Sequence, residues 1–167
     1  MQRSVDRPLN LVALIVSLAL GSCGALLDQE GASAGKLDIR LENATSRAVD
    51  ERTSQVLQIY GFTLLRQQIS PTRIYIETSW RIRGVFKDEM ESGAVSAETR
   101  LILRGGPIRG STRGIQSNRS IWLVAENRIR NKEGEIINLS EFSAEFKAYI
   151  REIAAELTAA YHIDSML

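Results

Sequence analysis

The sequence predicts an α+β fold, a two-layer sandwich in which an antiparallel β-meander is covered by two helices in the order β-α-β-β-β-α. Three segments alternate apolar and polar residues, as half-buried strands do: residues 74–83, 95–104 and 121–130. Residues 49–60 and 142–161 instead repeat apolar residues at helical spacing. Because the alternating segments are consecutive, we expect them to pair antiparallel.

The first strand and the first helix are expected between residues 37 and 61. Three apolar residues alternate with charged ones, which indicates a short half-buried strand: Leu37, Ile39 and Leu41. Three polar residues that can cap the N terminus of a helix follow: Asn43, Thr45 and Ser46. Gly61 is expected to end the helix as its C′ residue, and the apolar residues 62–65 then form an exit or a small strand.

The alternation assigns a face to each residue of the three long strands. In the first of them the predicted core face carries Ile74, Ile76, Thr78, Trp80 and Ile82. The opposite face carries Tyr75, Glu77, Ser79, Arg81 and Arg83, so both arginines are expected to point outward. Core positions of the next two strands are Val95, Ala97, Thr99, Leu101 and Leu103, then Ile121, Leu123, Ala125 and Ile129. Residues 84–94, which include several charged side chains, are interpreted as a loop.

A long amphipathic helix is expected to close the chain. Residues 135–137 briefly extend the sheet, and Asn138-Leu139-Ser140-Glu141 resembles a capping box at the start of this helix. Its apolar stripe consists of Phe142, Phe146, Tyr149, Ile150, Ile153, Leu157 and Tyr161.

Residues 1–22 have the features of a cleaved export signal. Arg3 and Arg7 precede an almost unbroken apolar run from Leu11 to Leu20. This run is shorter than the roughly 20 residues of a membrane-spanning helix. It ends in Leu20-Gly21-Ser22-Cys23, which resembles the lipobox of bacterial lipoproteins. A plain secretory signal with an incidental cysteine is the alternative.

We therefore expect Cys23, the only cysteine of the chain, to be the acylated first residue of the mature protein. Residues 23–36 are rich in small and polar residues and are interpreted as a flexible tether, and residues 37–167 as a single domain. Gly24 stands where Asp marks inner-membrane retention in enteric bacteria. The expected location is the periplasmic side of the outer membrane, with the inner membrane as the alternative.

Charge and chemistry exclude some classes of function. With 21 basic and 20 acidic residues, the chain gives no electrostatic basis for binding nucleic acid. The single histidine, His162, has no metal-ligand spacing around it and is interpreted as an exposed or capping residue near a helix end. Asp88, Glu89 and Glu91 can be imagined as paired carboxylates, but a solvated loop is the preferred interpretation. We expect no catalytic residue, metal or cofactor; a hydrolase with an unrecognised site is the alternative.

Arginines gather in one part of the sequence. No acidic residue lies between Glu98 and Glu126, a stretch that contains Arg100, Arg104, Arg109, Arg113 and Arg119. The guanidinium group suits phosphate and carboxylate, which makes four of them candidate anion-binding or partner-binding residues: Arg104, Arg109, Arg113 and Arg119. The alternative is a solvated face with cross-strand pairs to Glu77 or Glu98.

Two aromatic residues, Tyr75 and Trp122, fall on faces opposite the predicted core. They are interpreted as lying under a loop or as marking a partner-binding surface. A twist of the strand register that places them in the core is the alternative.

The lipobox and the order of the predicted elements together resemble the LPS-assembly lipoprotein family. The local similarity is greatest in Ser46-Arg47-Ala48-Val49 and Gly61-Phe62-Thr63-Leu64-Leu65, where that family also runs from a helix into a glycine-led hydrophobic exit. The resemblance implies a small α+β domain that plugs an outer-membrane β-barrel and helps to insert lipopolysaccharide. The arginine-rich segment does not match the family residue by residue.

Together these observations predict a lipid-anchored, non-enzymatic binding or assembly module of the cell envelope. Its expected partners are the membrane, through the lipid, an envelope protein and an anionic glycolipid. A purely structural lipoprotein is the alternative.

Overall fold

The computed structural model describes residues 35–108 and 118–163, and it confirms the α+β class. The strands are β1 (Lys36–Arg40), β2 (Ala44–Thr45), β3 (Leu64–Ile69), β4 (Ile74–Thr78), β5 (Arg81–Arg83), β6 (Ser96–Pro107) and β7 (Asn118–Arg130). The helices are α1 (Ser46–Ile59), α2 (Lys87–Glu91) and α3 (Ala144–Ile163). The expected signal, lipobox and Cys23 lie outside the described residues.

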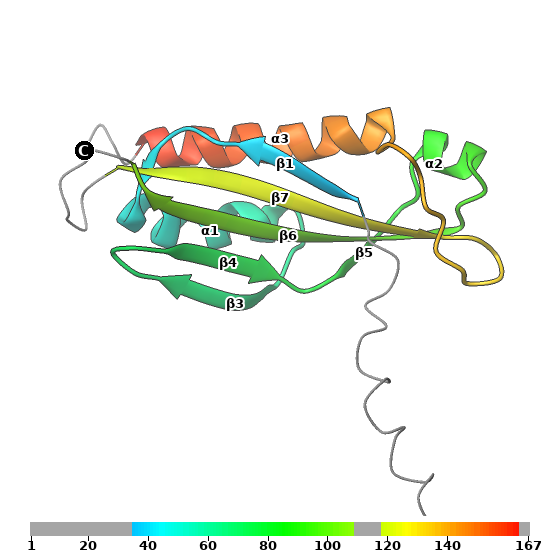
Figure 1. Ribbon diagram of the computed structural model, residues 1–167, viewed down its shortest axis with the longest axis horizontal. Helices are drawn as coiled ribbons and strands as arrows, with labels where there is room; N and C mark the ends of the chain where they lie inside the picture. The colour runs from blue at the N-terminus through cyan, green and yellow to red at the C-terminus, as the bar shows by residue number, and fades with distance from the viewer. Residues whose placement is uncertain (1–34, 109–117, 164–167) are drawn as a thin grey trace, which may run out of the picture. The chain divides into compact units, whose positions relative to one another are not determined.

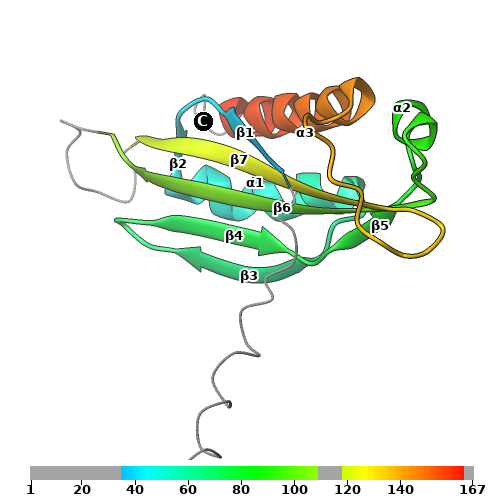
Figure 2. The same ribbon diagram turned by 45° about the vertical axis from the view of Figure 1, so that its right-hand side comes forward.

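All the described strands belong to one antiparallel sheet with the order β1-β7-β6-β4-β3, in which β2 pairs with β7 and β5 pairs with β6. The long pair β6 and β7 forms its centre, and α1 and α3 cover one face (Figures 1 and 2). No helix of the described residues covers the opposite face, which we call the open face. The predicted two-layer arrangement is therefore confirmed, with additional short strands and α2.

α1 begins and ends with the signals that its sequence contains. Thr45 is the N-cap residue, and its hydroxyl accepts a hydrogen bond from the Ala48 N–H at 3.1 Å. At the other end Gly61 has a φ of 73°, a left-handed conformation that favours glycine. The N–H groups of Gly61 and Phe62 donate to the carbonyls of Gln58 and Leu57, both at 2.9 Å, which is a Schellman motif. This end turns the chain directly into β3.

One extra residue between β4 and β5 overturns the predicted faces of residues 80–83. In β4, Ile76 pairs with Leu103 of β6, whereas in β5, Arg83 pairs with Ala97. The register of β5 against β6 is therefore displaced by one residue relative to that of β4. A displacement of one residue moves every later side chain to the other face of the sheet. Ile82, predicted to be buried, is 76% exposed. The side chain of Arg83, predicted to point outward, is only 4% exposed.

The segment 84–94 is not the simple loop that its charge suggested, because it contains the short helix α2. This helix lies on the same side of the sheet as α3 and contacts its first turn. The backbone N–H of Glu145 donates to Asp88 Oδ2 at 3.1 Å, which links the two helices.

α3 begins at Ala144, later than the predicted capping box at 138–141. Ser143 caps it, since its hydroxyl accepts the Phe146 N–H at 3.1 Å. The residues before it continue beside the sheet instead. The Ile137 N–H donates to the Ile129 carbonyl at 2.9 Å, and this contact confirms the predicted brief extension.

The core lies between the helices and the covered face of the sheet. Its largest fully buried side chains include Leu57 of α1, Ile150 of α3 and Leu123 of β7. Replacing such a residue with alanine typically costs about 2–5 kcal/mol of stability. One polar contact joins the two helices inside the core: the hydroxyls of Thr53 and Tyr161 are 2.8 Å apart. Burial raises the pKa of the Tyr161 hydroxyl, so it stays neutral.

Candidate functional site

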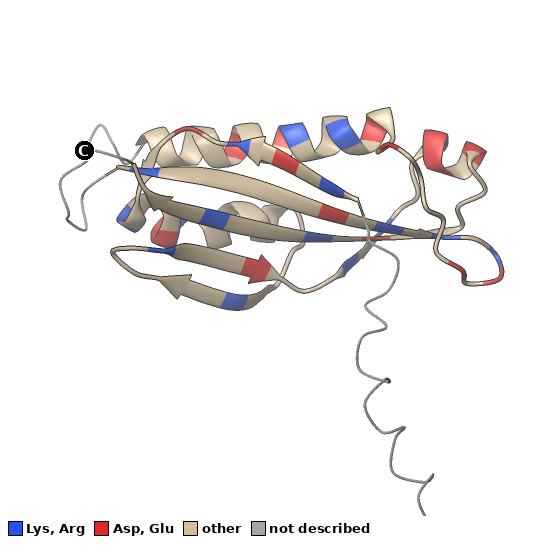
Figure 3. Ribbon diagram, in the orientation of Figure 1, with Lys and Arg blue, Asp and Glu red and all other residues tan. Residues whose placement is uncertain are grey.

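Residues of both charges occur along the strands of the sheet (Figure 3). The open face also carries the aromatic residues Tyr75 and Trp122. Trp122 of β7 is 38% exposed there, and Tyr75 of β4 is half-buried, which confirms that both residues lie opposite the core. Because strands β1, β7, β6 and β4 are adjacent, equivalent positions on them form rows that cross the sheet.

One such row combines arginines with both aromatic residues. In the strand register Arg40 of β1 lies opposite Trp122, Trp122 lies opposite Arg104, and Arg104 lies opposite Tyr75. Two further arginines flank the Tyr75 ring, with the guanidinium carbons of Arg66 and Arg73 at 5.7 and 5.5 Å from its centroid. We call these six residues the arginine–aromatic stripe.

The stripe has more positive charge than its neighbours neutralise. Arg104 pairs with Asp38 at 3.0 Å, and both side chains are substantially exposed. Arg40, Arg66 and Arg73 are exposed and form no ion pair with any residue that the structure describes. Burial and a hydrogen bond to Glu77 raise the pKa of the Tyr75 hydroxyl, so this group stays neutral. The stripe is therefore a surface suited to anionic groups.

Beside the stripe lies a denser ionic network. Arg100 Nε donates to Glu126 Oε2 at 2.9 Å, Arg100 Nη1 donates to Glu77 Oε1 at 2.9 Å, and Lys36 Nζ lies 3.1 Å from Glu126 Oε1. Burial alone would raise the pKa of the Glu126 carboxyl, but the hydrogen bonds and charges of Arg100 and Lys36 lower it below its usual value. These charges balance within the sheet, so this network has less capacity for an outside anion.

The structure separates the predicted anion-binding arginines. Arg104 belongs to the stripe, whereas Arg119 is 2% exposed on the helix-covered side, where its Nε donates to the Ser46 hydroxyl at 3.3 Å. Arg109 and Arg113 lie outside the described residues. Sequence reasoning missed Arg40, Arg66 and Arg73. The alternation of residues 36–40 placed Arg40 on the outward face, but its cross-sheet neighbours became known only from the strand order.

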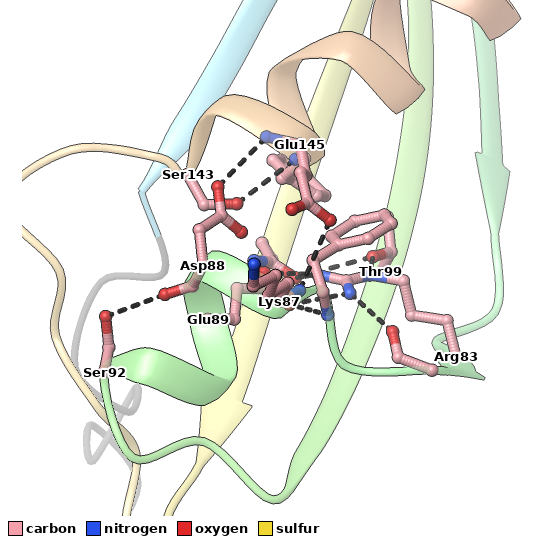
Figure 4. Close-up of polar contacts among 12 residues, drawn as sticks. Arg83, Lys87, Asp88, Glu89, Ser92, Thr99, Ser143 and Glu145 are labelled. Atoms are coloured by element: carbon pink, nitrogen blue, oxygen red, sulfur yellow. Dashed lines mark hydrogen bonds and ion pairs between the residues drawn. The ribbon is translucent and has the colours of Figure 1, made fainter.

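A second polar cluster is buried on the covered face, and Figure 4 shows it. Arg83 Nη2 lies 2.6 Å from Glu89 Oε1, and Glu89 is fully buried. Arg83 also donates to Thr99 and to Asn127, at 3.0 and 2.9 Å. The interpretation of Glu89 as part of a solvated loop is therefore wrong. Once the register shift turns Arg83 inward, α2 supplies the carboxylate that compensates it.

The other residues considered for catalysis have structural contacts. Burial would raise the pKa of Asp88, but the N–H of Glu145 and the hydroxyl of Ser143 lower it below its usual value. Glu91 is exposed. His162 lies in the last turn of α3 with an exposed side chain, as predicted, and its Nε2 contacts Glu42 Oε2. Over residues 35–108 and 118–163, no group of three or more His, Cys, Asp and Glu side chains is arranged to hold a metal.

No helix in the described part of the chain is both long enough and apolar enough to span a bilayer. Neither protein-family models nor curated proteins give a match to this chain.

Proposed function

We propose that this protein is a lipid-anchored, non-enzymatic binding module of the bacterial envelope, which contacts an envelope protein through the open face of its sheet. The arginine–aromatic stripe is the observation that carries the proposal. It places four arginines and two aromatic rings on a face that no described helix covers. Arginine and aromatic residues are the types most enriched at the energetic centres of interfaces.

The same stripe supports an anionic glycolipid as a second partner. Guanidinium groups bind phosphate in a bidentate manner, and Trp122 provides an apolar surface between two of them. Anchoring at Cys23, which lies outside the described residues, would keep the domain at the membrane that contains such lipids. The proposal includes the outer membrane as the location, because residue 24 is Gly and not the Asp that marks inner-membrane retention.

A hydrolase is the less favoured alternative. The carboxylates that would serve it are engaged elsewhere, since Glu89 compensates Arg83 and Asp88 joins α2 to α3. Loss of envelope hydrolysis in an Asp88→Asn variant that folds normally would favour this alternative over the binding module.

The central experiment is affinity purification of full-length lipidated protein from its own envelope, in detergent. The stripe variant is Arg40→Glu with Arg104→Glu. The control is Arg47→Glu with Arg151→Glu, which makes the same change of net charge at exposed positions on the helices. We expect a partner protein to be lost from the stripe variant and kept by the control. Retention by both variants would refute the open face as the contact surface.

Two further measurements separate the parts of the proposal. Binding of purified lipopolysaccharide to the same two variants tests the glycolipid, and equal binding by both would exclude the stripe as its site. Mass spectrometry of the N-terminal peptide tests the anchor. We expect diacylated or triacylated Cys23, and an unmodified thiol in native envelopes would overturn the lipid attachment.

A further inference from the structure

A small pocket lies beside β5, on the side of the sheet that the helices cover. It has a volume of about 230 Å³ and is lined by Arg81, Arg83, Gly84, Val85, Phe86 and Tyr149. These residues come from β5, from the segment leading into α2, and from α3. The pocket is thus separate from the stripe, and it owes its existence to the register shift that turned β5 over.

The two arginines of this pocket differ in their charge balance. Arg83 is neutralised by Glu89, with contacts of 2.6 and 2.8 Å. Arg81 donates one hydrogen bond, from Nη1 to Tyr149 Oη at 3.0 Å, and its guanidinium carbon lies 5.3 Å from the centroid of the Phe62 ring. No carboxylate in the described part of the chain is within ion-pair distance of Arg81. One positive charge in the pocket is therefore uncompensated.

Tyr149 provides a second donor. Its hydroxyl oxygen accepts the hydrogen bond from Arg81, so its own proton is available, and no described residue accepts it. Burial raises the pKa of Tyr149, and the neighbouring arginines only partly offset that rise, so the hydroxyl keeps its proton near neutral pH. A guanidinium and a phenol hydroxyl side by side can donate to the two oxygens of one carboxylate.

Apart from the neutralised Arg83, the rest of the lining is apolar, and it sets the size of the ligand. The rings of Phe86 and Tyr149 have centroids 5.8 Å apart, and Val85 lies beside them. The volume is below the roughly 300–1,000 Å³ of pockets for drug-sized ligands. Such a space accepts a short aliphatic chain or a single ring.

We propose that this pocket binds a carboxylate on a short apolar stem, with Arg81 and Tyr149 as donors to its oxygens and with Phe86 and Val85 against the stem. Two sources have this chemistry: a free monocarboxylic acid, and an acidic side chain of a partner polypeptide. The site is independent of the proposed envelope function, and either source fits it.

The test is an NMR titration of the full chain, in which Cys23→Ser prevents acylation. The probes are hexanoate for the free acid, the blocked peptide acetyl-Ala-Glu-Ala-amide for the side chain, and hexanamide as the uncharged analogue. We expect saturable shifts at Tyr149 and Phe86 with one or both carboxylates and none with hexanamide. The carboxylate that binds more tightly identifies the source.

Variants make the test specific. Arg81→Gln should weaken carboxylate binding at least about tenfold, the change expected from about 1.4 kcal/mol of lost interaction. Tyr149→Phe keeps the ring, removes the donor and should weaken binding a few-fold. Arg151→Gln makes the same charge change on the exposed side of α3 and should leave binding intact. Chemical shifts that do not saturate would overturn the proposal. Binding of hexanamide, combined with equal carboxylate binding by Tyr149→Phe and the native protein, would overturn it as well.

Discussion

Two arginine–glutamate pairs link elements of this domain in contrasting surroundings. Arg83 of β5 and Glu89 of α2 lie on the covered side of the sheet, with side chains 4% and 0% exposed. Arg100 and Glu126 lie on the open face, where the arginine is 25% exposed. In the covered pair the protein itself satisfies the arginine, through Glu89, Thr99, Asn127 and the Gly84 carbonyl.

The difference shows what burial demands of an ion pair. A charge that is removed from water must find all of its hydrogen-bond partners inside the protein, or the cost of desolvation exceeds the attraction. Arg83 meets that condition and therefore ties α2 to the sheet. The open face requires no such completeness, and so it can keep arginines without carboxylate partners, as the proposed partner contact needs.

Breaking the covered pair should have the largest effect. Glu89→Gln retains the shape of the side chain but leaves the buried charge of Arg83 without its counterion, and we expect a loss of about 3–5 kcal/mol in the free energy of unfolding. Urea denaturation measures this loss. Glu91→Gln, two residues further along and exposed, is the control and should change stability by no more than about 0.5 kcal/mol. Equal stability of the two variants would show that the covered pair is not a stabilising contact.

Replacing both charges together should sharpen this result. The double variant Arg83→Met with Glu89→Leu removes the uncompensated charge, and we expect it to recover most of the stability that Glu89→Gln loses. A residual cost of about 1–3 kcal/mol remains, because Asn127 loses its hydrogen bonds with Arg83 and Glu89. A double variant less stable than Glu89→Gln would instead show that packing around the pair matters more than its charge.

Acid should weaken the pair on the open face. The pKa of Glu126 in the folded protein is below that in the unfolded chain, so its stabilising contribution is complete above the unfolded value of about 4.3. That contribution is lost as the pH falls from there through the lowered folded pKa. Urea midpoints measured across this acidic range should fall less steeply for Glu126→Gln than for the native protein. Glu133→Gln, in an exposed turn, should keep the native slope.

The smallest effect on stability is expected at the stripe. Arg104→Ala removes an exposed pair with Asp38, in which the side chains are 56% and 46% exposed, so the free energy of unfolding should change by about 0–1 kcal/mol. Thermal unfolding tests this expectation. A loss comparable to that of Glu89→Gln would mean that the stripe serves the fold rather than a partner.

The sequence predicted the parts of the fold that depend on one-sided burial. Alternation located β4, β6 and β7, and helical spacing located α1 and α3, because each of these elements packs a single face against the core. The glycine end of α1 was predictable for the same local reason, since Gly61 adopts the left-handed conformation that ends a helix. The start of α3 was not, because the segment 138–141 that resembles a capping box precedes the helix, and Ser143 caps it instead.

The principal errors share one origin. Trp80 and Ile82 continue the apolar alternation of β4, so nothing within the segment signals the extra residue that its pairing with β6 reveals. That single shift buries Arg83, and the buried arginine in turn explains why Glu89 is not in solvent. The helix that supplies Glu89 spans five residues, too few for a periodic pattern to emerge.

The sequence predicted only some residues of the arginine–aromatic stripe. Trp122, Tyr75 and Arg104 follow from alternation within single strands. The stripe itself depends on which strands are neighbours, and β1 pairs with β7, the last strand that the structure describes. Arginines that are far apart in sequence, such as Arg40 and Arg104, therefore come together only in the folded sheet.

The pairing of β1 with β7 also constrains when this domain can fold. A chain that emerges from a ribosome or a translocation pore begins with its N-terminal segment, yet the partner strand of that segment is among the last to appear. Until then, β1 has no strand to pair with, and α3, which contacts α1, follows later still. Such a chain gains most of its long-range contacts late, so we expect the sheet to close only after residues 118–130 have been released.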